Sequence, residues 1–129
     1  MIMGPHENRF TEAARRTFAR TRYLVTPDSN RMGYRLDGPR LEYADRKDML
    51  SDATPMGSLQ VPSSGWPILL MADRQTTGGY PKIATVITAD LPLAGQLAPG
   101  DWIEFEPCSR TAAIEALRRR EAALLGTLP

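Results

Sequence analysis

Turn-forming residues divide most of this sequence into short segments. Ten glycines and eleven prolines stand among its 129 residues, which is about 16% of the chain where the average is about 12%. Proline interrupts helices and strand ladders, and glycine supplies the backbone angles that tight turns need. The excess therefore predicts many turns that join short strands.

Residues that favour β-structure recur between these turns. Met32, Tyr34 and Leu36 alternate with other residues, as expected of a half-buried strand. The turn at 62–65 separates two apolar segments and predicts a hairpin. The predicted strands cover residues 23–26, 32–36, 58–61, 68–72, 83–88 and 102–106.

Helical patterns appear mainly near the two ends. Thr11 is expected to cap a helix that runs to Arg20. Ser109 or Thr111 is expected to cap a last helix that runs to about residue 125, and 91–99 is expected to form a helical turn. The buried stripe of the first helix should comprise Phe10, Ala14 and Phe18.

This pattern predicts a mainly β fold, a closed antiparallel β-barrel or sandwich with flanking short helices. Short strands follow one another closely, and no strand alternates with a helix as parallel sheets require. A chain of 129 residues is long enough for one domain. The expected core residues of the barrel are Ile68, Leu70, Val86, Ile87, Ile103 and Phe105.

Charge and composition exclude several classes of function. Sixteen basic and fifteen acidic residues leave a formal charge of +1, so nucleic-acid binding has little electrostatic support. No apolar run approaches the roughly 20 residues of a membrane helix. The N-terminal residues carry no signal-peptide pattern, and one cysteine fits a reducing compartment. We therefore expect a cytoplasmic protein with no nucleic-acid or membrane partner.

The sequence contains too few ligands for a structural zinc site. Such a site needs four nitrogen or sulfur ligands, whereas the chain has one histidine, His6, and one cysteine, Cys108. We expect no metal site, a surface or capping role for His6, and burial of Cys108 as a small apolar group.

The densest polar cluster, Asp73 to Tyr80, follows the most apolar predicted strand. Gly78 and Gly79 let a ligand approach the backbone closely, and the neighbouring amide and hydroxyl groups both donate and accept hydrogen bonds. Asp73 supplies a carboxylate that can act as a base. The alternative interpretation is a loop whose side chains bond to its own backbone. The polar residues of the cluster are Asp73, Gln75, Thr76, Thr77 and Tyr80.

Two further positions are candidates for the same site. The turn 28–31 contains Asn30 and Arg31, which could bind a ligand or form an Asx turn with exposed arginines. Gln60 lies within an apolar strand and faces away from Leu59 and Val61, either toward solvent or into a polar pocket.

Five segments, in this order along the chain, carry a resemblance to a known family: residues 27–38, Gln60-Val61-Pro62, Gly65-x-Pro67-Ile68, the block 73–80, and Leu97-x-Pro99-Gly100-Asp101. From about Gly4 to Phe105 the chain closely resembles the biotin-dependent carboxyltransferase family, also called allophanate hydrolase subunit 2. The family includes the C subunit of the ATP-dependent 5-oxoprolinase, the Kip antagonist protein and part of urea carboxylase.

The resemblance implies a cyclophilin-like barrel formed by residues 1–129. Full family members are about twice as long, so the chain should correspond to their C-terminal half. An isolated half is expected to be inactive, and whether the chain acts as an enzyme depends on a sister subunit similar to allophanate hydrolase subunit 1.

The function implied first is that of a subunit of an ATP-dependent 5-oxoprolinase, which opens the lactam of 5-oxoproline to glutamate. The alternatives are a carboxyltransferase part of a urea carboxylase or allophanate hydrolase system, and a non-catalytic regulatory module of the Kip type. The complex would use ATP, but no cofactor is expected to bind to this chain.

The resemblance also implies roles for the polar residues. Asp73 would accept an N–H group or move a proton, and Arg31 would pair with a substrate carboxylate. A small amide substrate would be bound by Gln60, Gln75, Thr76, Thr77, Gly78, Gly79, Tyr80, Asn30 and Arg31.

Overall fold

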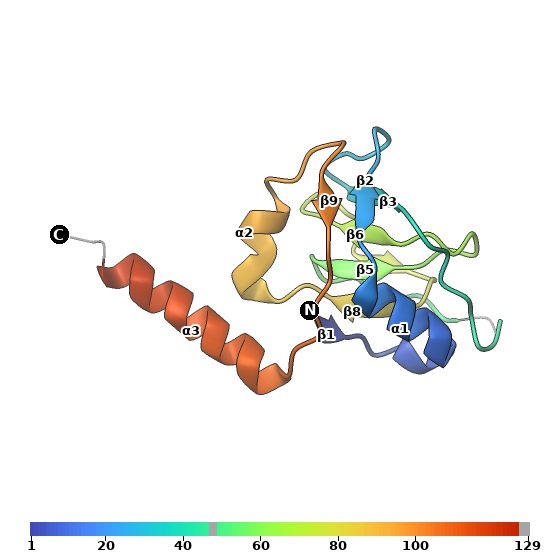
Figure 1. The fold of residues 1–129 in the computed structure, drawn as a ribbon, viewed down its shortest axis with the longest axis horizontal. Coiled ribbons are helices and arrows are strands. Elements are labelled where there is room, and N and C mark those ends of the chain that lie inside the picture. Colours follow the sequence, from blue (N-terminus) through green and yellow to red (C-terminus); the bar gives the residue numbers. More distant parts are fainter. Residues whose placement is uncertain (47–48, 127–129) are drawn as a thin grey trace.

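The computed structural model describes residues 1–46 and 49–126. In this part of the chain, one antiparallel sheet of seven strands curls into a half-barrel (Figure 1). Each strand of this sheet pairs only with its spatial neighbours, and every pair is antiparallel. The spatial order is β1 (Ile2–Met3), β8 (Lys82–Thr85), β5 (Ser58–Gln60), β6 (Ile68–Leu70), β3 (Gly33–Asp37), β2 (Tyr23–Val25) and β9 (Trp102–Ile103).

The mainly β character is confirmed, but the expected closure of the barrel is wrong. Within the described residues, the edge strands β1 and β9 do not pair with each other. Each edge strand has only two residues, too few for a further ladder. Two backbone bonds instead link the neighbouring segments: Met1 N donates to Glu106 O, and Cys108 N donates to Met1 O, both at 2.8 Å.

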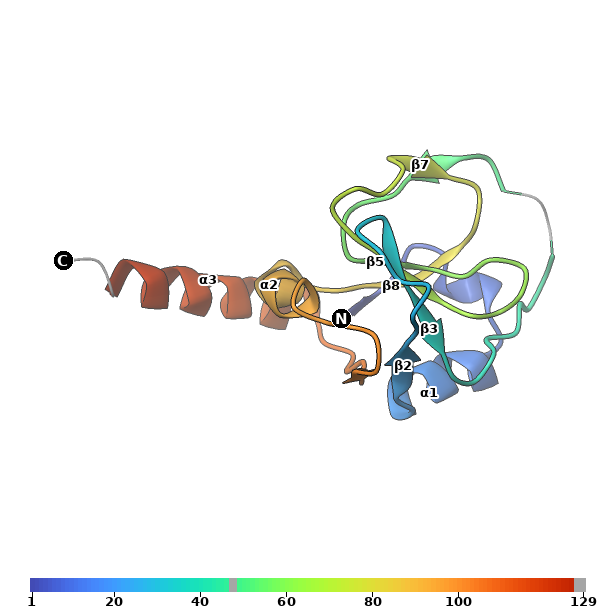
Figure 2. The ribbon, with the colours of Figure 1, turned by 90° about the horizontal axis from the view of Figure 1, so that it is seen from above.

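A small ribbon lies apart from the main sheet. It pairs β4 (Asp52–Ala53) with β7 (Thr77–Gly78), and Figure 2 shows β7 on the side of the molecule opposite α1. The sequence pattern predicted no strand here, and a loop over residues 76–81 is wrong for Thr77 and Gly78. A two-residue strand is too short to show the alternation that identifies strands in a sequence.

The helices begin and end close to the predicted positions. Thr11 Oγ1 accepts a hydrogen bond from Ala14 N at 3.0 Å, and Ser109 Oγ accepts one from Ala112 N at 3.0 Å, so Ser109 is the second cap. The longest helix extends away from the half-barrel in both views (Figures 1 and 2). The helical segments are η1 (Glu7–Arg9), α1 (Glu12–Arg20), η2 (Thr88–Asp90), α2 (Leu91–Ala94) and α3 (Arg110–Gly126).

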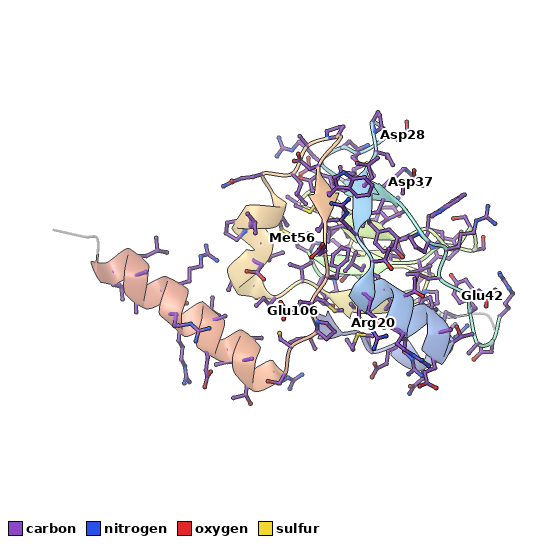
Figure 3. The ribbon with its side chains drawn as sticks, in the orientation of Figure 1. Arg20, Asp28, Asp37, Glu42, Met56 and Glu106 are labelled. Atoms are coloured by element: carbon purple, nitrogen blue, oxygen red, sulfur yellow. The ribbon has the colours of Figure 1, made fainter. Side chains whose placement is uncertain are left out.

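α1 packs on the half-barrel through an aromatic cluster. The Phe18 and Phe105 rings stack with centroids 4.7 Å apart, and Tyr23 lies beside both. Tyr23 Oη donates to Pro39 O at 2.8 Å, and burial raises the pKa of Tyr23 to about 12. The predicted stripe of α1 is confirmed as buried, whereas Arg20 lies on the exposed side of that helix (Figure 3).

The core differs from the predicted set at several positions. Leu70 and Phe105 are buried as expected. The other four expected residues are only half-buried, because the core face of the sheet is filled by their sequence neighbours or by other strands. The half-buried residues are Ile68, Val86, Ile87 and Ile103, and the fully buried aliphatic side chains are Leu41, Leu59, Val61, Leu69, Ile83 and Val25.

A β-bulge interrupts the pairing of β5 with β8. Leu59 pairs with Ala84, but the next residue, Gln60, pairs with Lys82, so Ile83 has no counterpart on β5. Ile83 and Ala84 are both fully buried with Leu59. The extra residue therefore aligns Lys82 with Gln60, on the other face of the sheet from Leu59.

We expect Phe18→Ala to lower the free energy of unfolding by about 3–5 kcal/mol, because it removes a fully buried ring and leaves a cavity. Ile114→Ala is the control, since Ile114 on α3 is 45% exposed and should cost less than about 1 kcal/mol. Urea denaturation measures both. Equal losses for the two variants would contradict the assignment of the core.

Candidate functional site

An open cleft of about 310 Å³, lined largely by polar residues, lies between the main sheet and the β4–β7 ribbon. Cross-strand pairing determines which side chains form its floor. Arg35 on β3 pairs with Ile68 on β6, and Ile68 pairs with Gln60 on β5. Directly paired residues share one face of a sheet, so these three side chains form a row along the cleft, with Gly33 and Leu70 beside them.

The other wall of the cleft comes from the ribbon and the segments that flank it. Gly78 comes so close to the floor that an added Cβ would lie 2.6 Å from Gln60 Nε2. At Gly79, by contrast, the nearest atom to an added Cβ is 4.0 Å away, so no steric reason requires glycine there. The lining residues on this side are Thr54, Arg74, Gln75, Thr77, Gly78, Gly79 and Tyr80.

The structure brings together most of the site residues that were predicted from the sequence. Those that line the cleft are Asn30, Gln60, Gln75, Thr77, Gly78, Gly79 and Tyr80. Asp73, Arg31 and Thr76 are not among the described lining residues. Their binding or catalytic roles stay predictions.

Asp73 and Arg31 pair with each other outside the cleft. Arg31 Nε lies 3.1 Å from Asp73 Oδ2, and Asp73 N donates to Arg31 O at 3.0 Å. The Arg31 and Asp73 side chains are 84% and 55% exposed, respectively. Each charge is thus balanced by the other at the surface, where such a pair contributes about 0–1 kcal/mol to stability.

Asn30 uses its amide oxygen within its own turn. Asn30 Oδ1 accepts hydrogen bonds from Met32 N at 2.8 Å and from Gly33 N at 3.4 Å. This is the Asx turn that the sequence also allowed. The Nδ2 group keeps two donors at the edge of the cleft.

Two arginines in the cleft were not predicted as site residues from the sequence. Arg74 is fixed by its bonds to Thr54 O at 2.6 Å and Ala72 O at 3.3 Å. Arg35 is exposed, and no described carboxylate lies within ion-pair distance of its guanidinium. No Asp or Glu is among the described lining residues, so the cleft is cationic. The alternation of Tyr34 and Leu36 was the signal that places Arg35 on the opposite face.

A second cleft of about 270 Å³ adjoins the first and shares Gly79 and Tyr80 with it. Tyr43 Oη donates to Val61 O in its wall, and burial raises the pKa of Tyr43. Arg9 and Arg46 also line it, and Arg9 Nε pairs with Asp45 at 3.1 Å. The second cleft therefore adds further arginine side chains beside the first cleft, on the side of the β4–β7 ribbon.

A larger groove, of about 660 Å³, lies elsewhere, between α2, β9 and α3. Its surface is mainly apolar, and Leu93 and Trp102 are exposed in it. Volume alone therefore does not identify the site, because the 310 Å³ cleft combines amide groups with unbalanced cations and this larger groove does not. Among the described residues, no three His, Cys, Asp or Glu gather closely enough to bind a metal ion, and no helix is long and apolar enough to span a membrane.

Comparison with known proteins agrees with the motifs. The family model described as "Carboxyltransferase domain, subdomain A and B" matches residues 1–107. The chain is 50% identical over 105 residues to the C subunit of 5-oxoprolinase from Haemophilus influenzae, covering 81% of this chain and 34% of that protein. It is 42% identical over 115 residues to the C subunit of 5-oxoprolinase from Escherichia coli, covering 89% and 37%. The chain thus spans about a third of the length of these relatives.

Solved structures show the same fold. The crystal structure of the Kluyveromyces lactis urea amidolyase superposes with a TM-score of 0.88 at 27% identity, covering 95% of this chain and 8% of that one. The K. lactis urea carboxylase gives the same TM-score and identity, covering 95% and 12%. α3 begins after residue 107, where the family match ends. Over the other residues, motif, sequence and fold agree: the chain belongs to the carboxyltransferase domain family of subdomains A and B, together with the C subunit of 5-oxoprolinase.

Proposed function

We propose that this chain is the substrate-binding part of a 5-oxoprolinase-type subunit. In this proposal the polar cleft binds a small molecule that carries both an amide and a carboxylate, as 5-oxoproline does. The observation that carries the proposal is the composition of the cleft, in which two arginines and two glutamines occur without a described carboxylate. The identity to the C subunits of two 5-oxoprolinases supports the choice of ligand.

The glutamines would bind the lactam. A lactam presents one N–H donor and one carbonyl acceptor, and a glutamine amide offers the complementary pair. Gln60 lies on the floor and Gln75 on the opposite wall, so the two can contact the ligand from different sides. Thr77 and the Asn30 amide add donors at the edge.

Arg35 would bind the carboxylate. Guanidinium and carboxylate groups match in a bidentate geometry, and Arg35 is the cleft arginine that is not held by backbone carbonyl groups. The family resemblance implied Arg31 for this role, but Arg31 is paired with Asp73. We therefore assign the carboxylate to Arg35.

A second candidate is carboxyl transfer in a urea carboxylase system. The likeness to urea amidolyase favours it, with a TM-score of 0.88. Urea is smaller and has no carboxylate, so it would leave the Arg35 charge unbalanced. For this reason 5-oxoproline is the better match to the cleft.

ATP would be used elsewhere in the complex. The sequence has no phosphate-binding loop, because no Lys-Ser or Lys-Thr pair follows Gly78 and Gly79. In the proposal, a sister subunit and the rest of the complex activate the lactam, and this chain holds it in place. Opening of the ring would require the assembled complex.

We expect the chain to bind 5-oxoproline more tightly than urea, and Arg35→Met to raise the Kd for 5-oxoproline by about 10- to 100-fold. The reason is that a hydrogen bond to a charged group contributes about 1.5–3 kcal/mol. Isothermal titration calorimetry measures the Kd.

Arg22→Met is the matched control, because Arg22 lies over the Trp102 ring at 4.6 Å and outside the cleft. It should leave the Kd unchanged. Equal affinity of Arg35→Met and the unchanged chain, or a preference for urea, would contradict the proposal.

We also propose that Asp73 transfers a proton in the assembled complex, after it separates from Arg31. Asp73→Asn in a complete subunit, assayed with its partner subunits, is then expected to lower turnover by about 10²–10⁴-fold. The melting temperature should barely change, since the Asp73–Arg31 pair is exposed.

Glu42→Gln provides the control, because Glu42 is an exposed carboxylate outside the cleft (Figure 3). If the turnover of Asp73→Asn stays within tenfold of that of Glu42→Gln, Asp73 transfers no proton and forms only a surface ion pair.

A further inference from the structure

One lysine of the main sheet is buried with its charge. The sequence uses arginine for fourteen of its sixteen basic residues, and Lys47 and Lys82 are the two lysines. The Lys82 side chain is only 3% exposed, and no hydrogen-bond acceptor among the described residues lies within reach of its Nζ. A buried ammonium without such partners costs several kcal/mol, so this position needs an explanation.

The nearest charged groups compensate Lys82 only in part. Asp52 Oδ2 lies 3.9 Å from Lys82 Nζ, beyond hydrogen-bond distance, and the same oxygen lies 3.6 Å from His6 Nε2. His6 Nδ1 accepts the Lys82 backbone N–H at 3.1 Å, so in neutral His6 the hydrogen is on Nε2, facing Asp52. Burial and the nearby Lys82 lower the pKa of His6, which favours this neutral form.

Lys82 extends the row of paired side chains beyond Gln60, but it is not among the described residues that line the cleft. Arg35 pairs with Ile68, Ile68 with Gln60, and Gln60 with Lys82. Three strand spacings of about 4.8 Å separate the two ends of the row, roughly 14 Å between Cα atoms. A small ligand that reaches from one cationic end toward the other therefore passes over Gln60.

The ribbon covers the Lys82 end of this row. Gly78 on β7 leaves no room for a Cβ beside Gln60, and its pairing partner on β4, Asp52, is the charged group next to Lys82. The cleft is thus open at Arg35, and beyond Gln60 the ribbon covers Lys82, whose Nζ is buried. Lysine suits a covered ligand site because its compact ammonium can direct three donors at a single oxygen.

We propose that Lys82 is a further ligand-binding residue, whose ammonium donates a hydrogen bond to the carbonyl oxygen of the lactam when the ligand displaces the ribbon that covers it. The inference rests on the proposed function, because it concerns the same ligand: it names the residue that binds the lactam carbonyl, at the other end of the molecule from the carboxylate. Arg35 binds the carboxylate, Gln60 lies between, and Lys82 binds the carbonyl oxygen. Asp52 and His6 position the ammonium and do not contact the ligand.

The competing explanation is purely structural. Lys82 could serve only to attract Asp52 and so hold the ribbon against the sheet. The two roles differ in what the Lys82→Met variant does. Loss of an incompletely compensated buried charge should leave the melting temperature unchanged or raise it, whereas loss of a ribbon anchor should lower it and should affect every ligand equally.

The experiment compares two ligands that share a ring and a carboxylate. 5-Oxoproline carries the lactam carbonyl, and cyclopentanecarboxylate lacks both the carbonyl and the ring nitrogen. Calorimetric titration of the chain should show that Lys82→Met raises the Kd for 5-oxoproline by about 10- to 100-fold and leaves that for cyclopentanecarboxylate unchanged. Arg35→Met should weaken both ligands, and Arg22→Met should weaken neither.

A second measurement does not depend on the folding of a variant. With lysine labelled at its ε carbon, the chain gives two signals, one from each lysine. Addition of 5-oxoproline should shift the Lys82 signal and cyclopentanecarboxylate should not. Lys47→Arg assigns the signals if Lys82→Met does not fold.

The failures of the two proposals are distinguishable. If the unchanged chain binds 5-oxoproline and Arg35→Met weakens it, while Lys82→Met binds normally and the Lys82 signal stays in place, the role of Lys82 is overturned and the proposed function stands. An equal loss for both ligands in Lys82→Met also overturns that role. If the unchanged chain binds neither ligand, both proposals fail.

Discussion

The hydrogen-bond register of the main sheet determines what the cleft can bind. Strands pair β3 with β6, β6 with β5, and β5 with β8, and these pairings align Arg35, Ile68, Gln60 and Lys82 across one face. A shift of one residue in any pair would turn the polar side chains of that strand toward the core. Such a shift would be costly, because it would turn fully buried side chains of these strands, Leu59, Leu69 or Ile83, out of the core.

Local features of the sequence predicted the local structure well. Thr11 and Ser109 cap their helices, and the turn at 62–65 joins a true hairpin, because each of these signals acts within a few residues. Register and closure depend on residues distant in sequence. Closure of the barrel would require longer edge strands than β1 and β9, and the pairing of two-residue β4 and β7 leaves no periodic signal.

In the candidate site, too, features that depend on neighbouring residues were predicted, and features that depend on residues distant in sequence were missed. The block 73–80 was found because its polar residues are contiguous, and most of it lines the cleft. Arg35 was passed over because an alternating strand predicts only which face it occupies, not that the ribbon lies above that face. Conversely, Arg31 and Asp73 looked suitable for a ligand, but they are close enough to bind each other. Sequence composition identifies possible charges, whereas the fold decides which of them are already balanced.

The bulge between β5 and β8 has an evolutionary consequence. In a regular ladder with Leu59 opposite Ala84, the residue opposite Gln60 would be Ile83. The extra residue instead places Lys82 there, and deletion of Ile83 would leave Lys82 opposite Gln60 and Ala84 opposite Leu59 in an unbroken ladder. A related domain can therefore gain or lose this one residue without turning either neighbouring side chain to the other face of the sheet.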